Sequence, residues 1–422
     1  METRSFRFLH AADIHLDSPL RGLERYEGAP AAELRGATRE AFEALVRLAI
    51  DEEVAFVLIA GDLYDGDWED YSTGLYLIRQ LAALRKAGIR VYLVAGNHDA
   101  QSKISRHLTL PENTVRFKHT APHTELLPEL GVAIHGQSYA QQKVVRDLSA
   151  DYPPPVRGLL NIGILHTALD GSRGHDPYAP CSVEALKNKG YDYWALGHVH
   201  AREIVHEEPW IVFPGNLQGR HVREGGAKGA TLVTVEDKRI VGVEHRVLDV
   251  LRWAELSVDL EGATHLDAAL ARARAALEGE VARAEGRLLA ARIVLTGATD
   301  AHSELASRWA QVVGELRAAA VDLGAVWVED VRLRTRPRVD LDALSQRDDA
   351  LGSLLRGFTD EVDVALSDAL LTELEPLTSR LPPELRERLP ALGGAGEADF
   401  AELWQGARQL VIAHLLSGED PA

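Results

Sequence analysis

The tetrapeptide Gly96-Asn97-His98-Asp99 follows an apolar run, residues 89–95 (IRVYLVA), that predicts a buried β-strand. Gly96 supplies the backbone freedom that a sharp turn at the tip of a strand requires. Asn97 then offers an amide oxygen, and His98 offers an imidazole beside it. Because oxygen and imidazole groups are common metal ligands, this strand end is a candidate for a functional site.

Four other predicted strand ends carry matching polar groups. They are Asp13 with His15, Asp62 directly after Gly61, His166, and His198 with His200. Side chains two residues apart on an extended backbone point the same way, so each of the two pairs converges. Each cluster follows a hydrophobic run, and all of them precede residue 201.

The order of predicted elements favours an α/β fold. Helical periodicity at residues 36–52 and 73–87 separates the first three strands, at 5–12, 54–60 and 89–95. A strand–helix–strand repeat favours parallel strands with right-handed crossovers, which gather functional groups at the carboxyl ends. Further strands are predicted at 114–119, 131–137, 159–165, 191–196, 211–213 and 231–236. The two halves suggest two sheets packed face to face with helices outside.

Composition shifts after about residue 250. Strand-like segments at 255–260, 291–296 and 326–334 alternate with helical segments at 266–284 and 303–320, which predicts a small α+β domain. The remainder is almost wholly helical, interrupted by prolines and glycines. We therefore expect three parts, at residues 1–250, 251–338 and 339–422.

Bulk composition limits the possible classes of protein. The chain has 422 residues, 46% of them hydrophobic, and no apolar run approaches the roughly 18 residues of a membrane span. The first residues, METRSFRFLH, lack an apolar signal core, so we expect a cytoplasmic protein without a membrane span. Cys181 is the only cysteine, which excludes a disulfide framework and a thiolate zinc cage. The net charge of −18 argues against tight, autonomous binding to nucleic acid.

Two divalent cations about 3.5–4 Å apart form an efficient centre for cleaving phosphoesters. Oxygen ligands bridge such ions, and imidazoles set their geometry. We expect seven side chains to hold two ions: Asp13, His15 and His200 for one, Asn97, His166 and His198 for the other, and Asp62 as the bridge. A hydroxide activated by the two ions would attack phosphorus, and the ions would stabilise charge on the phosphoryl oxygens.

Other residues near these motifs receive supporting roles. We predict that His98 hydrogen-bonds the phosphate in the transition state or protonates the leaving oxygen. Asp99 and Asp17 are the carboxylates expected to orient imidazoles. Arg220 and His221, in the loop GNLQGRH, are candidates for substrate contacts, although a solvated surface position explains Arg220 equally well.

Taken singly, each motif has an ordinary explanation. A lone D-x-H arises by chance, Asp62 after Gly61 suits a turn or helix cap, and His166 suits a hydrogen-bonded core position. Together, in this order and on strand ends, the motifs favour the metal centre. Histidines outside the motifs are interpreted as structural or surface residues: His10, His107, His119, His123, His135, His175 and His206.

The motifs DIH, GDLYDG, GNHD, LH and GHVH, in this order over about residues 5–235, resemble the calcineurin-like metallophosphoesterase superfamily. Within it, HAADIHLDSPLRGL and FPGNLQGRH resemble the bacterial YhaO branch, which is similar to SbcD nucleases and to the nuclease subunit of the meiotic-recombination repair complex. The resemblance implies a four-layer α/β/β/α sandwich and a dinuclear centre, usually of manganese. It also implies exonuclease and endonuclease activity on DNA, with the ligands and the His98 role given above.

The resemblance implies partners as well. Such nucleases form homodimers and bind a coiled-coil ATPase of the SbcC/YhaN type through a C-terminal helical segment. By position, residues 339–422 would be that segment and 251–338 the capping domain. An acidic subunit of this kind would borrow DNA affinity from its partner.

Two alternatives to a DNA-repair nuclease stay open. A phosphatase or a cyclic-nucleotide phosphodiesterase would use the same motifs, because the metal centre attacks any accessible phosphoester. The extra α+β domain and helical tail favour a large substrate and a partner. The other alternative is a scaffold with a vestigial site, which the presence of all seven ligands and His98 disfavours.

Overall fold

The computed structural model describes residues 5–18, 30–65, 71–101, 108–171, 178–338, 345–348, 352–353 and 356. The chain divides into two compact units, the first of Met1–Ala254 with Ala284–Ala290 and the second of Glu255–Arg283 with Ala291–Ala422. The helical segment expected at 339–422 lies almost entirely outside the described residues.

The first sheet of unit 1 has the strand order β12-β11-β1-β2-β3-β4. Its strands are β1 (Ser5–Ala11), β2 (Phe56–Ala60), β3 (Arg90–Val94), β4 (Thr114–Arg116), β11 (Gly229–Glu236) and β12 (Arg239–Val247). The pairs β1–β2, β2–β3 and β3–β4 are parallel, so their carboxyl ends share one edge. Strand β11 pairs antiparallel with β1 and β12.

The second sheet of unit 1 has the order β5-β6-β7-β8-β10-β9. Its strands are β5 (His123–Leu127), β6 (Val132–Gly136), β7 (Leu160–His166), β8 (Tyr193–Gly197), β9 (Glu203–Glu207) and β10 (Trp210–Phe213). The central strands β6, β7, β8 and β10 are parallel, and β5 and β9 are antiparallel edges. Both sheets therefore bring parallel strand ends together.

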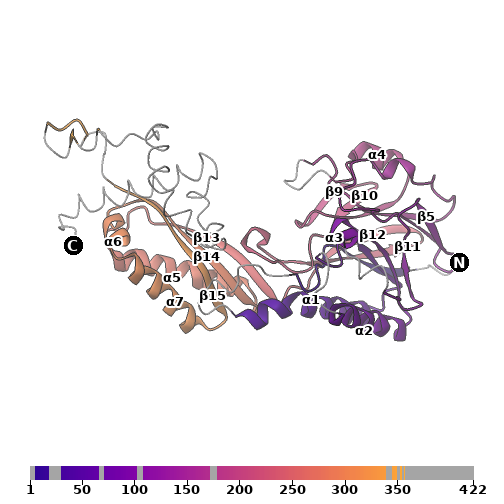
Figure 1. The fold of residues 1–422 in the computed structure, drawn as a ribbon, viewed down its shortest axis with the longest axis horizontal. Helices are drawn as coiled ribbons and strands as arrows, with labels where there is room; N and C mark the ends of the chain where they lie inside the picture. Colours follow the sequence, from indigo (N-terminus) through magenta and orange to yellow (C-terminus); the bar gives the residue numbers. More distant parts are fainter. Residues whose placement is uncertain are drawn as a thin grey trace, which may run out of the picture. The chain divides into compact units, whose positions relative to one another are not determined.

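Helices and sheets of unit 1 form four layers (Figure 1). Helices α1 (Ala31–Asp51) and α2 (Ser72–Lys86) cover the first sheet, burying residues such as Phe42 and Leu77 against it. Apolar side chains of both sheets, Phe56 and Ile162 among them, fill the space between the sheets. The short helix α4 (Val183–Asn188) packs on the outer face of the second sheet, where Trp194 is buried. The α/β/β/α sandwich predicted from the sequence is confirmed.

A buried histidine joins the two sheets beneath the strand ends. His10 on β1 is fully buried, with its Nδ1 3.0 Å from the Tyr193 hydroxyl and its Nε2 3.0 Å from the Leu196 carbonyl oxygen on β8. Because a carbonyl can only accept, Nε2 carries the proton and Nδ1 accepts from the tyrosine. Burial lowers the pKa of His10 to about 3, against the opposing effect of the Leu196 carbonyl. His10 is therefore a neutral structural histidine.

Several elements depart from the sequence prediction. Helix α1 begins at Ala31, within a segment expected to be a loop up to residue 35. Strands β5, β9 and β12 were not predicted, because each is an edge strand with few buried residues and so lacks an apolar run. The single helix expected at 303–320 is two helices, α6 (His302–Ser307) and α7 (Trp309–Leu323).

Unit 2 contains a sheet of order β13-β14-β15 with helices beside it (Figure 1). The elements are β13 (Leu251–Asp259), α5 (Leu266–Arg283), β14 (Leu288–Thr299), α6, α7 and β15 (Val326–Pro337). Arg292 on β14 donates to both carboxylate oxygens of Glu329 on β15, at 2.8 and 2.7 Å, which ties neighbouring strands together. Across the part of the chain that the structure describes, no helix is long and apolar enough to span a membrane.

Candidate metal centre

The structure brings the predicted ligands to one edge of the sandwich. Short helix α3 (Asn97–Gln101) follows β3 and starts with Asn97, while the other ligands lie at or just after the ends of β1, β2, β7 and β8. Among the residues that the structure describes, His and carboxylate ligand atoms within 4.8 Å of one another form three groups: Asp13, His15 and His200; His15, Asp62 and His98; and Asp62, His166 and His198. Asp62 belongs to two of the groups, which is the position expected of a bridging carboxylate.

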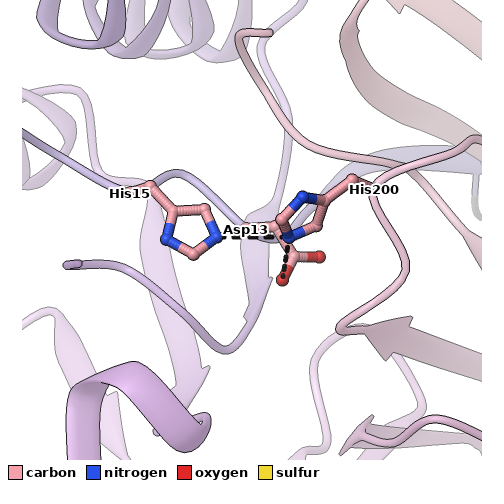
Figure 2. Close-up of side chains that lie close together, drawn as sticks. All are labelled: Asp13, His15 and His200. Atoms are coloured by element: carbon pink, nitrogen blue, oxygen red, sulfur yellow. Dashed lines mark hydrogen bonds and ion pairs between the residues drawn. The ribbon is translucent and has the colours of Figure 1, made fainter. Parts of the chain in front are cut away.

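One side of the cluster, the His200 side, consists of Asp13, His15 and His200 (Figure 2). The two imidazole Nε2 atoms are 3.3 Å apart, and His200 Nε2 is 3.8 Å from Asp13 Oδ1. The side chains of Asp13 and His15 are fully buried, and that of His200 is 15% exposed. Three donor atoms thus converge from two different strands at the rim of the cluster.

The opposite side, the His166 side, consists of Asp62, Asn97, His166 and His198. The Nδ1 of His166 is 2.9 Å from the Ala60 carbonyl oxygen, so Nδ1 carries a proton. Its Nε2 lies 2.9 Å from Asn97 Oδ1 and 3.4 Å from Asp62 Oδ2. A neutral imidazole would therefore direct a lone pair at two oxygen acceptors, and a positive charge is needed between them.

This arrangement of donors fits a divalent cation. Burial alone would lower the pKa of His166, but the Asp62 carboxylate raises it to about 9, so a proton supplies the positive charge. Burial alone would raise the pKa of Asp62, and His166 more than reverses that effect. A cation among the same atoms would replace the proton and leave every donor with a partner. Nitrogen, carboxylate and amide oxygen donors suit manganese or zinc.

The backbone at the ligands is held in an uncommon conformation. Asp13, His15, Asp62 and His198 have φ of 50°, 48°, 51° and 101°, in the region that disfavours side chains with a Cβ. Hydrogen bonds hold these turns, since the Asp13 amide donates to the Gly61 carbonyl and the His15 amide to the Asp62 carbonyl, both at 3.0 Å. The strand ends thus stabilise conformations that place functional side chains.

Three glycines make room for His166. A Cβ on Gly61 would lie 2.4 Å from His166 Nδ1, and one on Gly96 would lie 2.8 Å from His166 Cε1. A Cβ on Gly197 would lie 1.9 Å from the Ala60 carbonyl oxygen and 3.0 Å from His166 Nδ1. No side chain fits at these positions, so the glycines that precede the ligands are required by packing as well as by turning.

Sequence reasoning missed two carboxylates that hold imidazoles, Asp65 and Glu224. Asp65 Oδ1 is 2.8 Å from His98 Nδ1, and Glu224 Oε1 is 2.7 Å from His200 Nδ1. For His98, burial would lower the pKa, but Asp65 and Asp62 raise it. Asp65 follows Asp62 by three residues in GDLYDG, which is the signal that could have identified it. Glu224 lies in a loop after the last motif and has no such signal.

The two carboxylates expected to orient imidazoles have other partners, so that prediction is wrong. Asp99 Oδ1 accepts from the Tyr64 amide and Oδ2 from the Gly96 amide, both at 3.0 Å, which fixes the turn after β3. Asp17 accepts from Arg39 at 2.6 Å and binds Thr73, which joins the loop after β1 to α1 and α2. Both are turn and loop anchors.

The two residues expected to contact substrate differ in exposure. The side chain of Arg220 is 15% exposed and pairs with Glu224 and Asp65. The side chain of His221 is 53% exposed, with Nε2 3.6 Å from Glu224 Oε1. Arg220 is therefore a partly buried residue beside the cluster, and His221 is exposed.

Comparison with known families assigns this geometry to a class. Residues 6–202 match the profile of the calcineurin-like phosphoesterases, and residues 253–336 match that of the middle domain of metallophosphoesterase YhaO. The chain therefore carries a calcineurin-like phosphoesterase domain, the class of hydrolase that its sandwich and clustered ligands define. The second match is a similarity to YhaO over residues 253–336, in agreement with the sequence resemblance.

Curated relatives agree with this assignment. The chain is 37% identical over 265 residues to an uncharacterized metallophosphoesterase YhaO of Bacillus subtilis, covering 62% of this chain and 65% of the relative. It is 30% identical to the DNA double-strand break repair protein Mre11 of Methanopyrus kandleri over 60% of this chain and 58% of the relative. The same repair protein of Sulfurisphaera tokodaii is 25% identical over 54% and 59% of the two chains. The chain thus spans less than two thirds of the length of these relatives.

Proposed function

We propose that this chain is a metal-dependent DNA nuclease that hydrolyses phosphodiester bonds, acting in DNA repair. The observation that carries the proposal is the convergence of three ligand groups, of which the first and second share His15 and the second and third share Asp62. Two divalent cations, for which we propose Mn²⁺, would activate water and stabilise charge on the phosphoryl group when bound there. Asp13, His15 and His200 would hold one, Asn97, His166 and His198 the other, and Asp62 would bridge them.

His98 is the residue proposed to act on the substrate. Its Nδ1 donates to Asp65, so its Nε2 is the atom available to the reacting groups. It shares a ligand-atom cluster with His15 and Asp62, and its side chain is 35% exposed. An imidazole held at the rim of the cluster can donate a hydrogen bond to the phosphate or a proton to the leaving oxygen.

The choice of DNA as substrate rests on the similarity to the two repair proteins. We propose that a homodimer and a coiled-coil ATPase partner, of the type that SbcD-like nucleases bind, supply DNA affinity in the cytoplasm. The net charge of −18 supports this division of labour, because an acidic chain attracts the DNA backbone poorly. Residues 251–338 would act as the capping domain and 339–422 as the partner-binding segment.

The experiment is cleavage of linear DNA by the purified chain with and without Mn²⁺, using the wild type, His98→Ala and His123→Ala. His123 is a matched control, because its side chain is 51% exposed and it lies on β5, outside the three ligand groups. We expect cleavage that requires Mn²⁺, persists in His123→Ala and falls on the order of 100-fold in His98→Ala.

The same plate contains small phosphomonoester and phosphodiester substrates. Turnover of a small substrate with intact DNA would contradict the nuclease proposal and favour a phosphodiesterase or phosphatase. Absence of all cleavage, also after addition of a coiled-coil ATPase partner, would favour a scaffold with a vestigial site.

A further inference from the structure

One guanidinium joins the two carboxylates that hold histidines on different parts of the cluster. Arg220 donates from its NH2 group to Glu224 Oε1 at 2.9 Å and from Nε to Glu224 Oε2 at 3.3 Å. Its NH1 group lies 3.5 Å from Asp65 Oδ2. Asp65 contacts His98, and Glu224 contacts His200. The contacts therefore run without a break from His98 through Asp65, Arg220 and Glu224 to His200.

Burial and charge make these contacts strong. The side chains of Arg220, Asp65 and Glu224 are 15%, 17% and 6% exposed, so water screens them little. Glu224 also accepts from the backbone amide of Arg220 at 2.8 Å and from the Asn216 side chain at 2.9 Å. An arginine fork matches the geometry of a carboxylate, which a lysine ammonium does not. The positive guanidinium of Arg220 thus pairs with the negative carboxylates of both Asp65 and Glu224.

The hydrogen-bond chemistry shows that Nδ1 of His200 carries a proton. An arginine can only donate, so the 3.3 Å approach of its NH2 group to His200 Nδ1 cannot be a bond to a protonated nitrogen. Glu224 Oε1 is closer to that nitrogen, at 2.7 Å, and the carboxylate can only accept. Nδ1 therefore carries a proton, which leaves Nε2, 3.8 Å from Asp13 Oδ1, as the nitrogen that the neutral ring would offer to a metal. Arg220 donates to both oxygens of the Glu224 carboxylate, which restricts its rotation.

We propose that Arg220 is a positioning residue that orients His98 and His200 together through Asp65 and Glu224, and is not a contact for substrate phosphate. Three of its nitrogens already face carboxylates, and a phosphate would have to compete with both of them. The inference rests on the metal-dependent phosphoesterase activity proposed above but does not depend on DNA being the substrate.

Three substitutions separate the steps. Asp65→Asn is expected to lower kcat on a small phosphodiester, because Asp65 holds His98 at 2.8 Å, and to weaken Mn²⁺ binding less than Glu224→Gln does, because Asp65 Oδ1 is 3.6 Å from Nδ1 of the proposed ligand His15. Glu224→Gln is expected to weaken one of two Mn²⁺ equivalents by about 10–100-fold, because it acts on a ligand. Arg220→Met is expected to produce both effects with little change in KM. Arg223→Met is the control, since Arg223 is an exposed neighbour with the same charge.

The measurements are Mn²⁺ titration of the metal-free protein, followed by calorimetry, and kcat and KM on the small diester. Labelling of Cys181, the only cysteine and a buried residue of unit 1, reports whether each variant is folded. If labelling shows that Cys181 is exposed in Arg220→Met, that variant is not folded, and Arg220→Lys is measured in its place. Lysine keeps the charge but cannot bind both carboxylates. Arg220→Lys should therefore still show at least one of the two defects, a lower kcat or weaker Mn²⁺ binding.

Two results would overturn the proposal. One is wild-type Mn²⁺ binding in Arg220→Met with a raised KM, which would identify a substrate contact. The other is wild-type Mn²⁺ binding and kcat in Arg220→Lys. Cleavage of the diester but not of DNA would defeat the nuclease proposal alone. A wild-type protein that binds no Mn²⁺ would defeat both.

Discussion

The two sides of the candidate metal centre are held in different ways. His166 is fully buried, and its Nδ1 donates to the backbone carbonyl of Ala60 on β2. His200 is partly exposed, and its Nδ1 donates to the side chain of Glu224 in a loop. A backbone carbonyl in a sheet moves only with the sheet, whereas the Glu224 carboxylate keeps its place through hydrogen bonds from other groups, such as Arg220 and Asn216. The fold thus holds the His166 side. The His200 side is held by other side chains, which can be replaced without disturbing the fold.

Removal of one imidazole from each side tests this difference. We expect His166→Ala and His200→Ala each to lower phosphoesterase activity on the order of 1,000-fold, since each removes a ligand from a centre worth several kcal/mol. Only His166→Ala should also destabilise unit 1, by about 3 kcal/mol, because it leaves buried Asp62 without its positive partner. Initial rates at saturating Mn²⁺ measure the first effect.

Urea unfolding of the metal-free variants, followed by labelling of Cys181, measures the second effect. Because that thiol is buried in unit 1, its reactivity reports the unfolding of that unit alone. Equal loss of stability in the two variants would contradict the comparison.

Crowding around His166 gives the next largest effect. Gly197→Ala places a Cβ 1.9 Å from the Ala60 carbonyl oxygen, which must move together with the Nδ1 hydrogen bond it accepts. We expect a loss of about 1–3 kcal/mol in stability and weaker Mn²⁺ binding. Gly36→Ala in α1 is the control, because its Cβ meets only the flexible end of Glu40 and alanine favours a helix. Thermal unfolding should show a lower midpoint for the first variant and an unchanged or higher one for the second.

Metal binding should stabilise the folded protein by a comparable amount. At Mn²⁺ concentrations about 100 times the dissociation constant, one bound ion adds about 2.7 kcal/mol to the free energy of unfolding. We expect a chelator to lower the unfolding midpoint of the wild type and to have a smaller effect on His166→Ala, which keeps the group of Asp13, His15 and His200 intact. A midpoint in the wild type that is insensitive to Mn²⁺ would argue against a metal centre.

The sequence predicted the parts of this site that follow a local rule. Asp13, Asp62 and His166 each follow an apolar run, and parallel strand order then requires them to meet at one edge. The four-layer sandwich followed from the same runs. The assignment of these residues as ligands stays a prediction, which the Mn²⁺ titrations address.

The rest depends on contacts between distant segments. Glu224 reaches His200 from a short 3-10 turn, Val222–Glu224, and no periodicity in the sequence marks a turn of that kind. Asp99 was misassigned because its carboxylate accepts hydrogen bonds from the backbone amides of Gly96 and Tyr64. A sequence motif does not reveal which backbone groups a side chain will bind. The left-handed φ of His15 is likewise set by the Asp62 carbonyl, which a different strand supplies.

The last effect depends on pH and concerns His10, which joins the strand of Asp13 to the strand that precedes His198. Burial lowers its pKa to about 3 from the ordinary 6.5. The folded state therefore keeps His10 neutral while the unfolded state takes up a proton below pH 6.5. Its contribution to stability is complete above that pH and declines as pH falls toward 3, by up to about 1.4 kcal/mol per pH unit.

We expect His10→Gln to be less stable than the wild type at pH 7.5, with the difference narrowing steadily toward pH 4.5. Urea unfolding of unit 1 at several pH values, followed by tryptophan fluorescence and by Cys181 labelling where the thiol is reactive, measures it. A difference that stays constant with pH would mean that the pKa of His10 is the same in the folded and unfolded states, and would contradict the conclusion that burial keeps the imidazole neutral.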